Sequence, residues 1–259
     1  MTKRIITGLA LIGVGVATTY YGGLLLFIWV AIISLLSTYE LIEMHRKNQV
    51  RVQGWLAYVL VGLALGSCFY WNSAWEHPLI AILCLGLIAG YLVELFSKKV
   101  LLFKTPLLAT LKIALFISGT FPFIFLLRNG NHGLLLMAFV CSCIWMLDIA
   151  ALFGGRFLGK TPLSNLSPKK TIEGSVIGTL LTLVWAAGFC HYFHLAYLLY
   201  LPLAVGICVV AQCGDLHESL VKRTFRTKDS SNILPGHGGI YDRADSTLFV
   251  IPAVFYLFN

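Results

Sequence analysis

Apolar residues occur along this chain in runs of about 20, and the shorter segments between the runs hold most of the charged side chains. An apolar helix of about this length crosses the hydrocarbon core of a lipid bilayer. The pattern predicts about nine membrane-spanning helices, at about residues 5–20, 23–43, 54–72, 78–97, 105–128, 133–154, 175–194, 196–217 and 245–258. We therefore expect an all-α polytopic membrane protein.

The composition indicates the same class. Hydrophobic residues make up 58% of the 259 residues and charged residues only 12%, whereas a soluble domain carries about 25% charge. No polar stretch is long enough to bury a core of its own. We expect a single membrane domain over residues 1–259, with N-terminal helices in 1–128 and a C-terminal half, 129–259, that contains the long polar segments.

Lysine and arginine give the chain a formal net charge of +8, and they gather after the even-numbered predicted helices. Cytoplasmic loops of membrane proteins carry such an excess of positive charge. We therefore place the N-terminus and the basic loops in the cytoplasm and the C-terminus outside. The positive charge is thus explained by membrane topology, and no nucleic-acid partner is expected.

The seven cysteines form no CxxC pair and lie in apolar runs, which favours small buried residues over disulfides or metal ligands.

Two of the predicted cytoplasmic loops are long, at about residues 155–174 and 218–244. The other connections are short. Long polar segments in an otherwise apolar protein are where binding and catalytic residues are expected. The sequence therefore predicts a cytoplasmic functional site, built from these two loops and the helix ends beside them.

The end of the predicted helix 196–217 places polar groups along one face. Steps of four, three and four residues separate Asp215, Ser219, Lys222 and Arg226, which is the spacing of one helix face. An acidic residue at membrane depth is costly and indicates a function. A carboxylate can hold a divalent cation, and lysine and arginine can neutralise phosphate oxygens. This face therefore suits a metal-bound polyphosphate; the alternative is a solvated helix end with internal ion pairs.

A glycine-rich segment follows, with the sequence Leu-Pro-Gly-His-Gly-Gly at residues 234–239. Glycines on either side of His237 let the backbone approach a ligand closely and present amides to an anion. The alternative for His237 is a turn position without chemistry. Asp242 and Asp245 come next, three residues apart, with Arg243 between them. Paired carboxylates just before a final membrane helix suggest the second half of a divalent-metal site.

The segment from Ser219 to Asp245 resembles the signature of the phosphatidate cytidylyltransferase family. The matching pattern is S-x-x-K-R, four residues, K-D, and later L-P-G-H-G-G-x-x-D-R-x-D. Ser231 and Ala244 depart mildly from the family pattern, and neither removes a polar group. A second segment, Ser-Pro-Lys-Lys-Thr at residues 167–171, resembles the other cytoplasmic motif of the family.

The resemblance implies an enzyme that transfers CMP from CTP to phosphatidic acid, with Mg²⁺ or another divalent cation as cofactor. The predicted catalytic residues are Asp215, Ser219, Lys222, Arg223 and Asp242. The predicted substrate-binding residues are Lys169, Lys170, Lys228, His237 and Arg243. The predicted metal ligands are Asp215, Asp242 and Asp245. The expected partners are CTP, phosphatidic acid and the bilayer of a bacterial inner membrane, and a homodimer is compatible with the family.

Two other function classes fit parts of the sequence. A secondary transporter for an anionic metabolite would use intramembrane charges and basic loops, but transporters favour midplane sites in repeated halves, and here the polar residues are concentrated on one side. A CDP-alcohol phosphotransferase would carry a D-G-x-x-A-R type motif, which is absent. An assay with CTP, phosphatidate and Mg²⁺ separates the three classes.

Overall fold

A computed structural model of the chain describes residues 2–71, 105–234 and 238–258, together with residues 86, 90, 91, 93–97, 100 and 236. These residues form helices joined by turns and two loops, and the isolated bridges Pro162–Thr171 and Leu234–Gly238 are the β-type pairings among them. The helices are α1 (Thr2–Tyr21), α2 (Gly23–Lys47), α3 (Gly54–Tyr70), α5 (Pro106–Ser118), α6 (Pro122–Asn129), α7 (Gly133–Leu158), α8 (Ile172–Tyr192), α9 (Tyr197–Thr224) and α10 (Tyr241–Phe258).

The all-helical prediction is confirmed for the described part of the chain, and most predicted helices begin and end within a few residues of the observed ones. Five helical segments there are long and apolar enough to cross a membrane, with α5 and α6 taken as one segment; α1 and α3 are shorter apolar helices. The predicted helix at 78–97 falls largely outside the described residues, and the number nine stays a prediction.

The predicted helix at 105–128 is divided in the structure. Helix α5 ends at Ser118 and α6 begins at Pro122. Proline has no N–H to donate to the preceding turn, and its ring clashes with that turn, so a helix breaks or kinks there. The Thr120 hydroxyl fills part of the break by donating to the Phe116 carbonyl oxygen at 2.7 Å. Pro122 thus begins a new helix, a position that proline favours.

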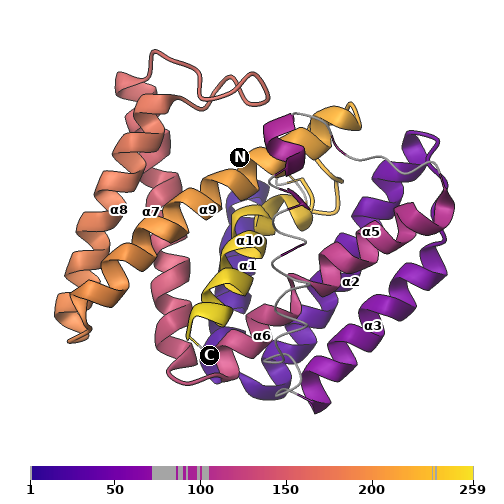
Figure 1. Ribbon diagram of the computed structural model, residues 1–259, viewed down its shortest axis with the longest axis horizontal. Helices are drawn as coiled ribbons and strands as arrows, with labels where there is room; N and C mark the ends of the chain where they lie inside the picture. The colour runs from indigo at the N-terminus through magenta and orange to yellow at the C-terminus, as the bar shows by residue number, and fades with distance from the viewer. Residues whose placement is uncertain are drawn as a thin grey trace.

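The loops gather at two opposite ends of the molecule (Figure 1). The connections after α2, α7 and α9 lie at the upper end in this view, and the turns after α1, α6 and α8 lie at the lower end. This alternation places the basic connections on one side, as the positive-inside rule requires. The α7–α8 loop (residues 159–171) and the α9–α10 loop (residues 225–240) therefore share one end.

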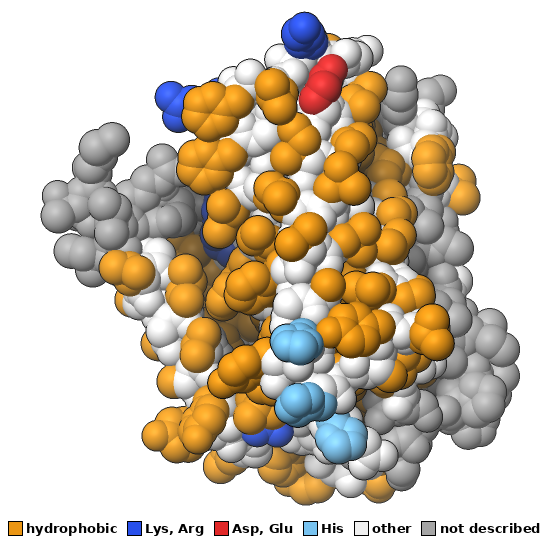
Figure 2. Space-filling view, turned by 90° about the vertical axis from the view of Figure 1, so that its left-hand side faces the viewer, with side chains coloured by type: hydrophobic (Ala, Val, Ile, Leu, Met, Phe, Trp, Pro, Cys, Tyr) orange, Lys and Arg blue, Asp and Glu red, His pale blue; other side chains and the backbone are white. Residues whose placement is uncertain are grey.

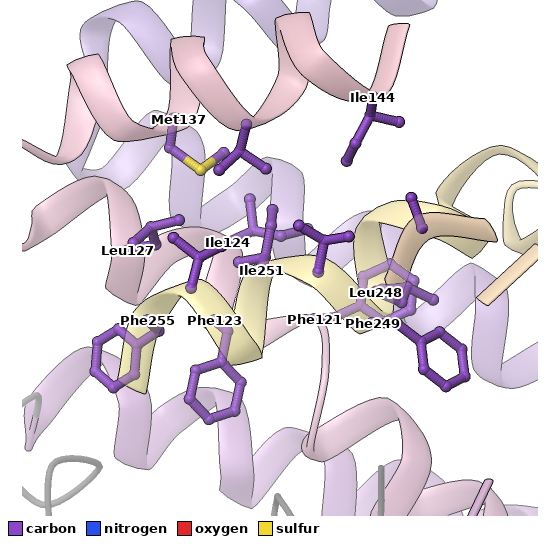
Figure 3. Packing of buried hydrophobic residues seen from close by; sticks show 14 of the residues in the cluster. Phe121, Phe123, Ile124, Leu127, Met137, Ile144, Leu248, Phe249, Ile251 and Phe255 are labelled. Atoms are coloured by element: carbon purple, nitrogen blue, oxygen red, sulfur yellow. The ribbon is translucent and has the colours of Figure 1, made fainter. Parts of the chain in front are cut away.

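Helix α10 lies at the centre of the apolar core. Its side chains Phe249, Ile251 and Phe255 pack among residues of α6 such as Phe123 and residues of α7 such as Met137 (Figure 3). Phe123 and Phe255 meet edge to face with ring centroids 5.2 Å apart. This packing fixes α10 against both halves of the chain, so the start of α10, where the polar motif lies, has a defined position.

Helices α7 and α8 pack very closely because Gly178 has no side chain. A Cβ atom at Gly178 would lie 2.9 Å from the Ala151 Cβ and 3.1 Å from the Leu147 carbonyl oxygen. A Cβ atom at Gly174 would likewise lie 2.7 Å from the Ala151 carbonyl oxygen. The small-residue spacing at 174 and 178 therefore serves helix packing within the chain, which is its usual role in membranes.

The outer face of α8 is apolar. Leu180 and Val184 are more than half exposed on this helix, at 57% and 69%. Figure 2 shows hydrophobic side chains between charged residues at the upper end and histidines at the lower end. An exposed apolar band with polar groups at both ends is the surface expected to contact lipid.

The shared end of the two loops gives a test of topology. Asp229 is exposed in the α9–α10 loop, and Tyr192 is exposed at the opposite end of α8. We expect a membrane-impermeant thiol reagent to leave Asp229→Cys unlabelled in intact cells and to label it in opened cells, whereas Tyr192→Cys is labelled in intact cells. The unsubstituted chain controls for its own cysteines. Labelling of Asp229→Cys from outside would contradict the predicted orientation.

Candidate active site

The polar face predicted at the end of 196–217 is helical, because α9 continues to Thr224. Asp215, Ser219, Lys222 and Arg223 all lie on its last turns, where the sequence pattern placed the start of a loop at about 218. Helix α10 begins at Tyr241, so the second set of motif residues occupies its first turns. The site is therefore formed mainly by two helix ends.

Gly214 allows α9 and α10 to approach each other beside these residues. A Cβ atom at Gly214 would lie 2.8 Å from the Phe249 ring and 3.0 Å from the Asp245 carbonyl oxygen. A larger residue would push α10 away from α9 at this point. The absence of a side chain thus brings Asp245 next to Asp215.

Three carboxylates converge where the helices meet. Asp215 and Glu218 come from α9 and Asp245 from α10, and one oxygen from each lies within 4.8 Å of the others. Glu218 is buried, and the two aspartates are half-buried. Carboxylates held this close repel one another unless positive charge lies among them. Oxygens at this separation can all reach one divalent cation, whose bonds to oxygen are about 2.0–2.6 Å long.

Two lysines supply positive charge to this group. Lys170, from the α7–α8 loop, forms an ion pair with Asp215. Lys222 contacts Glu218 Oε1 at 2.5 Å and Asp242 Oδ1 at 3.4 Å. Burial lowers the pKa of the Lys170 ammonium, while the nearby carboxylates of Asp245 and Asp148 act to raise it. The two lysines therefore place positive charge against carboxylates of both helices.

Asp242 lies beside the group of three but uses its carboxylate differently. It is 6% exposed and accepts hydrogen bonds from the amides of Ser230 and Gly239, both at 2.9 Å. A Cβ atom at Gly238 would lie 2.7 Å from the Asp242 carboxylate. The glycines of the segment at 234–239 therefore let the backbone close around a carboxylate of the protein itself. Asp242 holds the α9–α10 loop against α10.

The structure thus brings together two of the three predicted metal ligands, Asp215 and Asp245, and places Glu218 with them. Glu218 was not among the site residues predicted from the sequence. Its spacing of three from Asp215 on a helix could have indicated it, because positions i and i+3 are neighbours on a helix surface. Asp242, the third predicted ligand, is joined to the group through Lys222.

The other predicted residues that the structure describes lie on α9, on α10 and in the two loops beside them. Arg223 is exposed and donates to the Leu166 carbonyl oxygen at 3.5 Å, which links α9 to the α7–α8 loop. Ser219 is half-buried on α9. Three predicted substrate-binding residues are exposed at this end, namely Lys169, Lys228 and Arg243. His237 lies outside the described residues.

The α7–α8 loop is held in place by the start of α8. The Thr171 hydroxyl accepts from the Gly174 amide at 3.1 Å and caps the helix. The Glu173 carboxylate accepts from the amides of Lys160 and Thr161 at 3.1 Å. These contacts fix both ends of the loop and direct Lys170 to α9.

Charged residues within the helical bundle also have partners. Lys112 donates to Glu94 at 2.6 Å, and His217 contacts the other Glu94 oxygen at 3.2 Å. Asp148 lies within electrostatic range of Asp245 and Lys170. Asp148, on α7, therefore lies near the carboxylate group.

The chain is similar to known proteins along almost its whole length. A model of the cytidylyltransferase family matches residues 2–259. The chain belongs to this family. The phosphatidate cytidylyltransferase of Bacillus subtilis (strain 168) is 33% identical over 264 residues, covering 99% of this chain and 97% of that protein. The phosphatidate cytidylyltransferase of Helicobacter pylori (strain J99) is 34% identical over 249 residues, covering 95% of this chain and 88% of that protein.

A third relative matches more strongly over a shorter region. The phosphatidate cytidylyltransferase of Synechocystis is 46% identical over 134 residues, covering 50% of this chain and 45% of that protein. The family model thus covers the N-terminal helices as well as the polar motifs.

The position of Lys222 between Glu218 and Asp242 makes it the first residue to test. We expect Lys222→Ala to lower cytidylyltransfer by about ten- to a hundredfold, because a hydrogen bond to a charged group contributes about 1.5–3 kcal/mol. Turnover by the purified variant measures the effect. The control is Lys47→Ala, which removes an exposed lysine at the end of α2. Equal activity of the two variants would show that Lys222 serves the fold alone.

Proposed function

We propose that the chain is a phosphatidate cytidylyltransferase, which forms CDP-diacylglycerol and pyrophosphate from CTP and phosphatidic acid. The observation that carries the proposal is the group of three carboxylates faced by Lys170 and Lys222 at one end of an apolar bundle. A nucleotide triphosphate and a lipid headgroup can meet there without the acyl chains leaving the bilayer. The names of the relatives support the same reaction.

We further propose that Asp215, Glu218 and Asp245 hold a divalent cation, with Mg²⁺ as the expected ion. The donors are all carboxylate oxygens, which is the ligand type that Mg²⁺ prefers, and their mutual distance suits one ion. When bound, such an ion neutralises charge on the phosphates of the nucleotide. Asp242 supports this centre by holding the loop and by contacting Lys222.

The reaction requires little covalent chemistry from the protein. An oxygen of the phosphatidate phosphate attacks the α-phosphorus of CTP, the bond from that phosphorus to the bridging oxygen breaks, and pyrophosphate leaves with the bonding electrons. Positioning and charge neutralisation provide most of the rate enhancement in such transfers. Lys170 and Lys222 neutralise the phosphates nearest the carboxylates. Lys169, Lys228, Arg223 and Arg243 surround the entrance and attract both anionic substrates.

The lipid substrate reaches the site from the side. Its acyl chains cannot leave the bilayer cheaply, and the headgroup must lie level with the ends of α9 and α10. We propose that this end faces the cytoplasm of a bacterial cell, where CTP is made, and that the chain spans the inner membrane about nine times. A homodimer is compatible with this arrangement, in which one chain supplies the three carboxylates and both lysines.

The proposal predicts a divalent-dependent transfer of label from CTP to lipid. Purified protein in detergent or vesicles, with labelled CTP, phosphatidate and Mg²⁺, should form labelled CDP-diacylglycerol, and chelation should abolish the product. Asp215→Asn and Glu218→Gln should each lower turnover by at least about a hundredfold, because an amide keeps the shape but loses the charge that an oxygen-preferring cation needs.

The matched control is Glu43→Gln, whose carboxylate pairs with Arg46 at 3.0 Å on the surface of α2. It should retain full activity. Transfer without any divalent ion, or near-normal activity of both site variants, would contradict the metal centre. An absence of labelled lipid from the unsubstituted protein, with anion uptake into vesicles instead, would favour a transporter.

A further inference from the structure

Glu40 is a buried acid in the N-terminal half that none of the motifs includes. It lies in α2, and its side chain is 0% exposed. An ionised carboxylate without partners in such a place is very costly, so it must be satisfied by hydrogen bonds or by opposite charge. Its partners show what the residue does.

Both oxygens of Glu40 accept hydrogen bonds from the α9–α10 loop and the start of α10. Oε1 accepts from the Ser231 hydroxyl at 2.6 Å and from the Ile240 amide at 2.9 Å. Oε2 accepts from the Ser230 hydroxyl at 3.1 Å and from the Tyr241 amide at 2.8 Å. Four donors from a segment about 200 residues away in sequence thus meet one side chain.

The arrangement requires a carboxylate rather than an amide. Each Glu40 oxygen receives one backbone amide and one hydroxyl. A glutamine would turn its NH₂ group toward either Ile240 N–H or Tyr241 N–H, whichever way its amide is flipped, and a backbone N–H cannot accept. One buried amide would lose its partner in both orientations. The negative charge of Glu40 is also stabilised by the N-terminus of α10, where the helix dipole is positive.

The backbone is shaped to fit this carboxylate. A Cβ atom at Gly239 would lie 2.7 Å from both Glu40 oxygens, so only glycine allows the approach. Gly239 also donates its amide to Asp242 at 2.9 Å. Glu40 and Asp242 therefore hold the same turn from opposite sides. Ser230 connects them, because its hydroxyl bonds to Glu40 and its amide bonds to Asp242.

We propose that Glu40 is a positioning residue for the active site: it anchors the α9–α10 loop and the first turn of α10 so that Asp242 and Asp245 face α9. Glu40 does not touch the carboxylate group or the lysines. It acts through the loop, and it makes helix α2 part of the catalytic unit. The inference rests on the proposed function for its effect on catalysis, but the anchoring itself can be measured without it.

The test compares Glu40→Gln with Glu43→Gln, the same substitution three residues further along α2. We expect Glu40→Gln to lower kcat by at least about tenfold, with a smaller change in KM for CTP, because the loop samples positions in which Asp242 and Asp245 are misplaced. Glu43→Gln should match the unsubstituted chain. Both variants are measured with the labelled-CTP assay.

Hydrogen exchange followed by mass spectrometry provides a readout independent of activity. In Glu40→Gln, peptides that cover residues 230–241 should exchange at least about tenfold faster, because either the Ile240 amide or the Tyr241 amide loses its acceptor and the turn is held less firmly. Peptides from α7 and α8 should exchange at an unchanged rate. A general loss of structure would instead raise exchange throughout the chain, which would overturn a specific positioning role.

Ser231→Ala is the second variant and removes only one of the four donors. It should shift exchange and kcat in the same direction as Glu40→Gln, by a smaller factor. Unchanged exchange at 230–241, or unchanged kcat, in both Glu40→Gln and Ser231→Ala would overturn the proposal. If the unsubstituted chain makes no CDP-diacylglycerol, the proposed function fails, and the exchange experiment still decides whether Glu40 anchors the loop.

Discussion

The close approach of α9 and α10 at Gly214 is the constraint on which the site depends. Because Phe249 and the Asp245 carbonyl oxygen occupy the space of a side chain at this position, three carboxylates meet at the edge of an apolar bundle. Helix packing thus holds three carboxylates close enough to repel one another. Positive charge has to lie among the carboxylates, and it comes from Lys222 on α9, from Lys170 in the α7–α8 loop and, in our account, from a divalent cation.

The same constraint explains why the polar end of the molecule is built from both halves of the chain. Helix α10 is fixed by its apolar packing against α6 and α7, and the backbone amides at its start need acceptors from elsewhere in the chain. The Glu40 carboxylate, on α2, accepts a hydrogen bond from the Tyr241 amide, and the Asp242 carboxylate accepts one from the Gly239 amide. Helix α2 thus contacts the turn that leads into the C-terminal motif residues.

The sequence was sufficient for features that local patterns determine. Apolar run length predicted the helices, and helical spacing placed Asp215 and Lys222 on one face. The sequence was insufficient where contacts between distant segments determine the position of a residue. Glu218 joins the carboxylates only because α10 brings Asp245 to it, and Glu40 meets partners 190 or more residues away, for which no local pattern exists. The break before Pro122 had a visible signal, because proline disfavours a helix interior.

The most direct measurement is the position of a bound ion. Crystals of the protein grown with Mn²⁺ and CTP would show the ion by its anomalous scattering. Our account predicts a peak within about 2.0–2.6 Å of oxygens from Asp215, Glu218 and Asp245, with Asp242 still bonded to the amides of its loop. A peak held by Asp242 with Glu218 unbound, or an ion bound away from all three carboxylates, would contradict it.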